Sequence, residues 1–203
     1  MNRLITLLLC LVATLTTRAG DMGNARQIFD KTYDSFYGQG GVRFNYKISA
    51  LGIYHETGWA CYKGNKSKSA HDDTVMWNDG ELLYKVRLKK KLVEIHDPKV
   101  NKEDQLLQKF KFYPDEFNYS VKREGDKLLL TLKAKKGAKN TKMKEVRILV
   151  DPVTYHPQQL RVKVLSLFWL KVTFTNFHAG NIADTTFDFP KEKYSGYRTE
   201  DRR

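Results

Sequence analysis

Cysteine is scarce in this sequence. The 203 residues include two, Cys10 and Cys61, and Cys10 lies in an apolar stretch close to the N-terminus. With a single cysteine outside that stretch, the domain cannot form an internal disulfide, so its hydrophobic core must hold it together. Cys61 lies in the strand-like run Thr57–Tyr62, and we interpret it as a small buried apolar side chain rather than a nucleophile.

Long apolar runs are equally scarce. The run Leu4–Leu15 is too short to span a bilayer. Arg3 precedes it, and the small residues Thr17 and Ala19 follow it at the two positions that a signal peptidase reads. We therefore expect residues 1–19 to be a cleaved secretory signal peptide and the mature protein to act in the periplasm.

Signatures of catalysis and of metal binding are missing from the sequence. Its five histidines form neither a HExxH nor a HxH pair, and it has no Walker loop and no Gly-x-Ser-x-Gly elbow. The segment His71–Asp73 could bind a cation, although a solvated loop is the simpler interpretation. We expect no catalytic residue, no metal site and no cofactor. The alternative is an exported hydrolase whose nucleophile and base converge from distant positions.

Acidic residues are outnumbered. The chain has 36 Lys and Arg against 23 Asp and Glu, a formal net charge of +13. Such an excess attracts anionic membranes, nucleic acids and acidic proteins. A secretory signal argues against nucleic acid, and the lysines are dispersed along strands and loops rather than gathered in a basic helix. We predict no nucleic-acid partner, and a solvated cationic surface is the simplest interpretation.

The hydrophobic pattern predicts one helix followed by strands. Apolar residues at helical spacing between Ala25 and Phe36 form one wide stripe, and Asn24 has capping-box spacing with Gln27. About six segments of alternating apolar and polar residues follow, then a short helical pattern over 101–112, then about five more such segments. Asn78–Gly80, between two of these segments, is a hairpin signal.

Regular hairpin spacing predicts a single meandering antiparallel sheet, which must curl when it has this many strands. We predict a mostly β fold with helices (α+β), in which about 11 strands form an incomplete β-barrel closed by a helical lid. The domain would span residues 20–190 and act as a monomer. Residues 191–203 would form a charged, frayed tail.

Aromatic residues are abundant, with 11 Phe, 11 Tyr and 3 Trp. A sheet capped by only two helices leaves a cleft, and an apolar cleft suits an acyl chain. The alternative is that these side chains simply fill the core. The residues predicted to line a lipid-binding cavity are Phe44, Tyr46, Ile48, Tyr84, Val86, Leu132, Ile148, Val150, Val162 and Val164. The residues predicted to form the lid are Ile28, Phe29, Leu106, Leu107 and Phe110.

The segment Leu160–Phe174 departs from simple alternation. Its even-numbered positions are almost all apolar, as expected for the inner face of a hairpin, but Leu165, Leu167 and Trp169 interrupt the polar odd-numbered face. Exposed apolar patches often mark docking sites for a membrane or a protein. We predict such a tip at residues 165–169. The alternative is that another element covers it.

Several segments resemble one known family. They are Ala25–Lys31, Trp77–Tyr84, Val146–Pro152, Phe174–Phe177 and Ile182–Pro190. In this order and spacing they resemble the periplasmic lipoprotein carriers, the LolA-like family, from about residue 25 to residue 190. Where the enterobacterial carriers have a functional arginine after the second strand, this sequence has Gly64 or Asn65, flanked by Lys63 and Lys66.

The resemblance implies an incomplete β-barrel with a helical lid and a cavity for the acyl chains of lipoproteins. It implies a non-enzymatic periplasmic chaperone. This chaperone would receive acylated lipoproteins from an inner-membrane ABC-type transporter and pass them to an outer-membrane acceptor or to the membrane itself. Related sheets carry other lipids or sense lipoproteins, so both a lipid carrier and a regulatory sensing domain stay open as alternatives.

Overall fold

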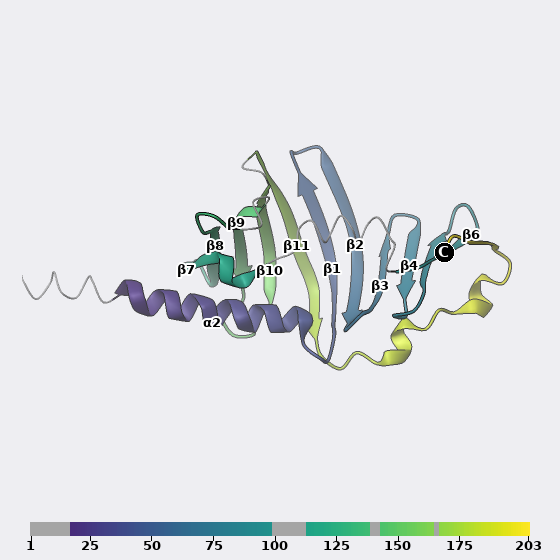
Figure 1. The fold of residues 1–203 in the computed structure, drawn as a ribbon, viewed down its shortest axis with the longest axis horizontal. Helices are drawn as coiled ribbons and strands as arrows, with labels where there is room; N and C mark the ends of the chain where they lie inside the picture. The colour runs from purple at the N-terminus through teal and green to yellow at the C-terminus, as the bar shows by residue number, and fades with distance from the viewer. Residues whose placement is uncertain (1–16, 99–112, 139–142, 165–166) are drawn as a thin grey trace, which may run out of the picture.

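The computed structural model describes residues 17–98, 113–138, 143–164 and 167–203 (Figure 1). One helix, α2 (Thr17–Tyr37), lies alongside a large sheet. The strands are β1 (Val42–Ala50), β2 (Tyr54–Lys63), β3 (Lys66–His71), β4 (Thr74–Asn78), β5 (Leu83–Arg87), β6 (Leu92–His96), β7 (Phe117–Glu124), β8 (Lys127–Ala134), β9 (Met143–Val150), β10 (Pro157–Val164), β11 (Phe168–Ala179) and β12 (Arg198–Asp201). Three short 3₁₀ helices are η1 (Pro114–Glu116), η2 (Asp184–Phe187) and η3 (Lys191–Tyr194).

All twelve strands belong to one curled sheet in the order β12-β6-β5-β4-β3-β2-β1-β11-β10-β9-β8-β7. Every neighbouring pair is antiparallel except β12 and β6, which are parallel. The prediction of a mostly β fold built on one curled, open antiparallel sheet is confirmed, with twelve strands in place of about eleven. The predicted second helix over 101–112 lies outside the described residues.

The helix begins earlier than its sequence pattern indicated. We expected the helix to start at Asn24, whereas α2 starts at Thr17 and Asn24 lies within it. Residues 17–23 contain no proline, so the backbone can continue as a helix past the capping signal. The predicted stripe is present, because Ala25, Ile28 and Phe29 are buried against the sheet. The Phe29 ring lies 5.2 Å from that of Tyr119 on β7.

Strand register divides the side chains between two faces, since residues directly opposite one another point to the same side. We call the face that α2 covers the helix face; on β1, β8 and β9 it carries Phe44, Leu132 and Ile148. The other is the strap face, which carries Lys47 and Trp59 and is partly covered by the C-terminal strap, residues 180–197. On the helix face α2 packs most closely against β7.

The apolar side of the sheet changes faces along its width. Phe44 on the helix face begins a row of residues that are paired across successive strands. The row continues with Ala60, Ser69, Met76, Lys85 and, on β6, Glu94. The helix face therefore becomes polar across β3–β6. The apolar row there lies on the strap face and consists of Trp59, Ala70, Val75, Val86 and Val93. We expected one apolar face throughout; instead each half of the sheet has its own cover.

The C-terminal segment corrects a second expectation. We predicted a frayed tail over 191–203, but η3 and β12 form there and β12 extends the sheet beside β6. Phe187 and Tyr194 of the strap are buried, and the Phe189 ring stacks on Tyr84 with centroids 4.1 Å apart. Aromatic residues inside the strap thus anchor a segment whose charged composition suggested solvent exposure. In the described parts of the chain, no helix combines the length and apolarity needed to cross a membrane.

Candidate functional site

An apolar strip on the helix face crosses β10, β11 and β1. Its members are neighbours in register: Ile48 lies opposite Val172, and Leu170 lies opposite Val162. We call this strip the open floor, and it consists of Ile48, Val162, Val164, Leu170, Val172 and Phe174. All six side chains are only partly buried, whereas Leu130 and Val150 on β8 and β9 are fully buried. The open floor is therefore apolar surface that the described core does not fill.

An aromatic cluster closes one end of the open floor. Phe36, near the end of α2, packs its ring edge-on against Phe44, Phe174 and Phe177, with centroids 5.6, 5.3 and 5.0 Å away. Edge-to-face contacts at these distances add stabilisation beyond simple burial. The C-terminal end of α2 is thereby fixed to β1 and β11. The floor continues from this cluster toward the ends of the β10–β11 and β1–β2 hairpins.

A tyrosine–glutamate cluster borders the floor on the β2 side. The Tyr46 hydroxyl donates a hydrogen bond to Glu56 Oε1 at 3.0 Å, and the Tyr54 hydroxyl donates one to Oε2 at 2.5 Å. Burial, together with the hydrogen bond to Glu56, raises the pKa of Tyr46 above its ordinary value. A Cβ at Gly58 would lie 2.7 Å from the Tyr46 hydroxyl oxygen, so glycine at this position lets the ring lie across β2. This cluster marks the change from apolar floor to polar sheet.

A buried carboxylate lies on the polar half of the helix face. The Glu94 side chain is 3% exposed and accepts a hydrogen bond from Arg87 Nε at 3.2 Å. Arg202 Nη1 lies 2.7 Å from Glu94 Oε1, whereas His96 Nε2 is 3.9 Å away, too far for a hydrogen bond. Two guanidinium groups therefore neutralise the carboxylate. This arrangement joins the C-terminus to β5 and β6, and it leaves Glu94 engaged as a structural partner.

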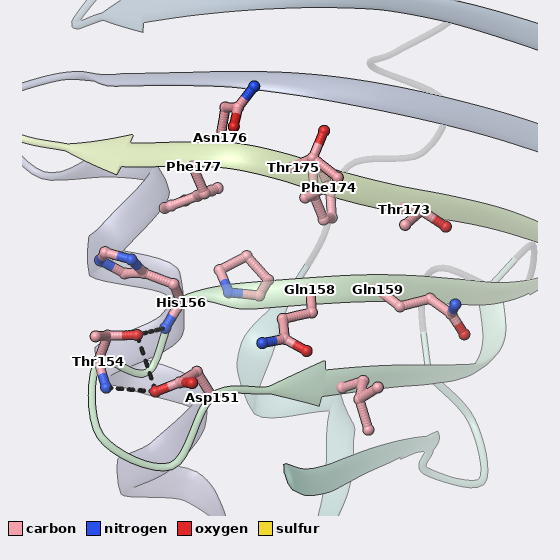
Figure 2. A pocket seen from close by; sticks show the side chains of 12 residues that line it. Asp151, Thr154, His156, Gln158, Gln159, Thr173, Phe174, Thr175, Asn176 and Phe177 are labelled. Carbon is pink, nitrogen blue, oxygen red and sulfur yellow. Dashed lines mark hydrogen bonds between the residues drawn. The ribbon is translucent and has the colours of Figure 1, made fainter. Parts of the chain in front are cut away.

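A cavity of about 440 Å³ lies between the β9–β10 turn and β11 (Figure 2). In that turn Asp151 Oδ1 accepts hydrogen bonds from the backbone N–H groups of Thr154 and Val153, which hold the pKa of this carboxyl below its usual value. His156 packs against Phe177 at 4.9 Å, and burial lowers the pKa of its imidazole. These contacts stabilise a turn, in which the Asp151 carboxylate is engaged by backbone N–H groups.

A second cavity, of about 650 Å³, crosses β11, β1, β2 and β3, mostly on the strap face. Asn45, Lys47, Trp59 and Thr173 are among its lining residues. Within the described ranges no three His, Cys, Asp or Glu side chains are grouped to hold a metal ion. Cys61 is buried, as predicted, and burial raises the pKa of its thiol. A raised pKa keeps the thiol protonated and therefore weakly nucleophilic.

The predicted cavity residues divide between the two faces. The eight on the helix face are Phe44, Tyr46, Ile48, Leu132, Ile148, Val150, Val162 and Val164. Tyr84 and Val86 lie on the strap face in the core beneath Tyr194, so they cannot share a cavity with the other eight. Phe44, Leu132, Ile148 and Val150 are buried, which leaves Tyr46, Ile48, Val162 and Val164 beside open surface.

The predicted site did not include three floor residues, Leu170, Val172 and Phe174. The same alternation that selected Val162 and Val164 also selects them, once the hairpin is recognised. Of the predicted lid, Ile28 and Phe29 are buried on α2, and Leu106, Leu107 and Phe110 lie outside the described residues. At the predicted tip Leu167 is exposed and Trp169 is half-buried on the strap face; Leu165 lies outside the described residues.

Comparison with known proteins supports the fold. No family model and no curated protein sequence matches this chain. Solved structures do: an uncharacterised conserved protein from Thermus thermophilus is 8% identical with a TM-score of 0.54, covering 88% of this chain and 99% of its own. MucB is 11% identical with a TM-score of 0.53, covering 84% of this chain and 64% of its own.

The similar structures also include a LolA superfamily protein from Nitrosomonas europaea. It is 12% identical with a TM-score of 0.37, covering 81% of this chain and 97% of its own. At identities this low, the matches to the Thermus thermophilus protein and to MucB show a shared fold alone.

Proposed function

We propose that this protein binds the acyl chains of lipids or lipoproteins on the open floor, outside the cytoplasm. The observation that carries the proposal is the partial burial of six apolar side chains that continue the core of the helix face across β10, β11 and β1. Apolar surface in contact with water costs about 25 cal/mol per Å². A floor of this kind is therefore stabilised by an apolar ligand that covers it.

Acyl chains need such a carrier in water. Burial of an acyl chain contributes about 0.8 kcal/mol per CH₂ group, so a lipid with two or three chains cannot cross an aqueous compartment unaided. A fully packed core would leave no room for the chains, whereas a half-open floor can receive and release them. Aliphatic residues provide this surface without polar groups that would need hydrogen-bond partners.

Within this proposal the protein is a periplasmic chaperone that carries lipoproteins from the inner to the outer membrane. An ABC-type transporter would supply the cargo, and an outer-membrane acceptor or the membrane itself would receive it. Residues 1–19 would be the secretory signal peptide. Ile28 and Phe29, with Leu106, Leu107 and Phe110, would form the lid. The partners would set the direction of transport, because this chain is assigned no nucleotide-binding role that could drive it.

A second candidate is a lipoprotein-sensing regulatory domain. It is favoured by the fold shared with MucB, which has also been solved in complex with MucA. A sensor would use the same open floor but would bind a protein partner in response to the ligand. The two candidates differ in the step after ligand binding: a carrier transfers the ligand to a membrane, and a sensor changes its affinity for a protein.

The experiment is native mass spectrometry of the protein made with its N-terminal segment in a Gram-negative host. We expect added mass from an acylated lipid or lipoprotein. Val172→Asp places a charge on the open floor, and it should weaken binding at least tenfold because a carboxylate is costly to bury beside an acyl chain. Thr175→Asp, on the exposed strap face of the same strand, is the matched control and should retain the ligand.

Two outcomes would count against the proposal. One is a ligand-free mass even when lipoprotein is supplied in excess, and the other is equal binding by the two aspartate variants. Circular dichroism of both variants checks that the sheet is intact.

A further inference from the structure

Two hairpin tips lie side by side at one end of the sheet. Ala50, the last residue of β1, is paired with Leu170, close to the start of β11. The β1–β2 turn, residues 51–53, is therefore adjacent to the end of the β10–β11 hairpin, where Leu167 lies. Figure 1 shows the two ends projecting in the same direction from the middle of the sheet.

Both tips present aliphatic side chains to water. Ile53 is 84% exposed, Leu167 is 78% exposed and Leu51 is 65% exposed, and Tyr54 beside them is also exposed. Single exposed apolar residues are ordinary on protein surfaces. Three large aliphatic side chains on two adjacent tips form a group, and such a group marks an interaction site.

The backbone conformation of Leu51 gives an independent reason to regard this group as an interaction site. Leu51 has φ = 55°, in the left-handed region that glycine and asparagine adopt readily. A bulky aliphatic residue there strains the turn and gains nothing from burial. Asparagine or glycine would fit both the turn and the solvent better. A strained and exposed aliphatic side chain of this kind is explained by contact with something outside the protein.

A row of cations lies just below the tips on the strap face. Arg161 on β10 is directly opposite Arg147 on β9 and Lys171 on β11. Like charges directly opposite one another destabilise a sheet. The row continues into Ser49 on β1 and Thr131 on β8 without a carboxylate. At about 3.3 Å per residue, Arg161 is roughly 10 Å from the end of its strand.

The positive charges of Arg161 and Lys171 are not neutralised by carboxylates in the part of the chain that the structure describes. The Arg161 side chain donates to the neutral Gln159 at 2.5 Å, and no ion pair forms at Arg161 or Lys171 among the described residues. Arg147 is paired with Glu145 at 2.7 Å and lies over the Trp169 ring, 4.8 Å from its centroid. Trp169 therefore lies between the cationic row and the apolar tip. An anion bound at Arg161 and Lys171 would relieve their mutual repulsion.

We propose that this end of the sheet docks on an anionic lipid bilayer. Leu51, Ile53 and Leu167 enter the boundary between headgroups and acyl chains, and Arg161 and Lys171 contact lipid phosphates. Trp169 lies at headgroup depth, where its amphipathic ring is favoured. Nucleic acid would match the cations but leave three aliphatic side chains in water, whereas a bilayer satisfies both features. This inference does not depend on what the open floor binds.

The test is flotation of the purified protein with lipid vesicles. The protein should float with vesicles of phosphatidylcholine that contain about one-third phosphatidylglycerol, and it should float poorly with phosphatidylcholine alone. Added salt should release it from the anionic vesicles. Replacing both Ile53 and Leu167 with Ser should weaken binding at least tenfold. Val153→Ser is the matched control, because Val153 is 82% exposed in the turn at the opposite end of β10. It should bind as the unaltered protein does.

Charge is tested in the same assay. Replacing Arg161 and Lys171 with Gln should weaken binding at least tenfold. Replacing the exposed Lys89 and Lys90, in the β5–β6 turn, with Gln removes the same net charge and should have little effect. All substituted residues are exposed, at turns or on the sheet surface, and far-ultraviolet circular dichroism checks folding.

Three results would overturn the proposal. Equal losses from the two charge pairs would show attraction by net charge alone. Full binding after the Ile53 and Leu167 replacements would exclude insertion of the tips. Binding to duplex DNA that depends on Arg161 and Lys171, without comparable vesicle binding, would identify the row as a nucleic-acid surface.

Discussion

Phe187→Ala is expected to lower the free energy of unfolding by about 4 kcal/mol. Phe187 is 0% exposed and packs with Cys61 and Ile182, where it holds the C-terminal strap against the strap face. Removing so fully buried a ring leaves a cavity that the surrounding side chains fill only in part. Urea denaturation followed by tryptophan fluorescence measures the change.

The matched control for this prediction is Lys191→Ala, an exposed position on the same strap. It should change the free energy of unfolding by less than about 0.5 kcal/mol. A cost below about 1 kcal/mol for Phe187→Ala would show that the strap contributes little to the core, contrary to the packing described above.

The features that the sequence predicted well depend on local chemistry. In the β4–β5 turn the side-chain oxygen of Asn78 accepts a hydrogen bond from the N–H of Gly80, and Gly80 has φ = 99°, so this turn specifies its own geometry. Alternation likewise revealed the β10–β11 hairpin, because a period of two residues assigns each side chain to a face without knowledge of distant strands. Cys61 was placed correctly for the same reason.

The choice of covered face could not be predicted, because it depends on distant contacts. Alternation shows that Tyr84 and Val86 share a face. Only the pairing across β1–β5 shows that this is the strap face and not the helix face that carries Phe44. The strap that covers them comes from residues far along the chain, and its charged composition concealed Phe187 and Tyr194 as anchors. The predicted cavity residues on β1 and β10 therefore share the helix face, whereas those on β5 lie on the strap face.

The exposed β1–β2 tip could have been found from sequence. Leu51 and Ile53 flank Gly52 in a turn where polar residues are usual. The turn was overlooked because its apolar residues resemble a continuation of the strand. Its significance depends on the β1–β11 pairing, which places it beside Leu167. No local pattern contains that information.

The two halves of the sheet are covered by different elements. The half formed by β7–β11 and β1 carries the open floor and the exposed tips, where a ligand and a membrane would be contacted. The half formed by β2–β6 is covered by the strap and joined to the C-terminus through Glu94. The strength of the Glu94 contacts tests this division.

Arg202→Ala is expected to lower the urea concentration at the midpoint of unfolding, because it leaves a buried carboxylate with one guanidinium partner in place of two. Glu94 is 3% exposed at its side chain, and Arg202 Nη1 is 2.7 Å from its Oε1. Glu94→Gln removes the charge that needs compensation. In that background Arg202→Ala should have a smaller further effect, so the two substitutions should be non-additive in a double-mutant cycle.

Arg203→Ala separates this buried contact from ordinary surface pairing. Arg203 is paired with Asp201, and both side chains are about half exposed, so its loss should leave the midpoint of urea unfolding almost unchanged. If Arg202→Ala costs no more than Arg203→Ala, or if the costs of Glu94→Gln and Arg202→Ala simply add, then Glu94 is not held by the C-terminus. The parallel pairing of β12 with β6 would in that case be maintained by backbone hydrogen bonds alone, and the C-terminal edge would be expected to fray before the rest of the sheet.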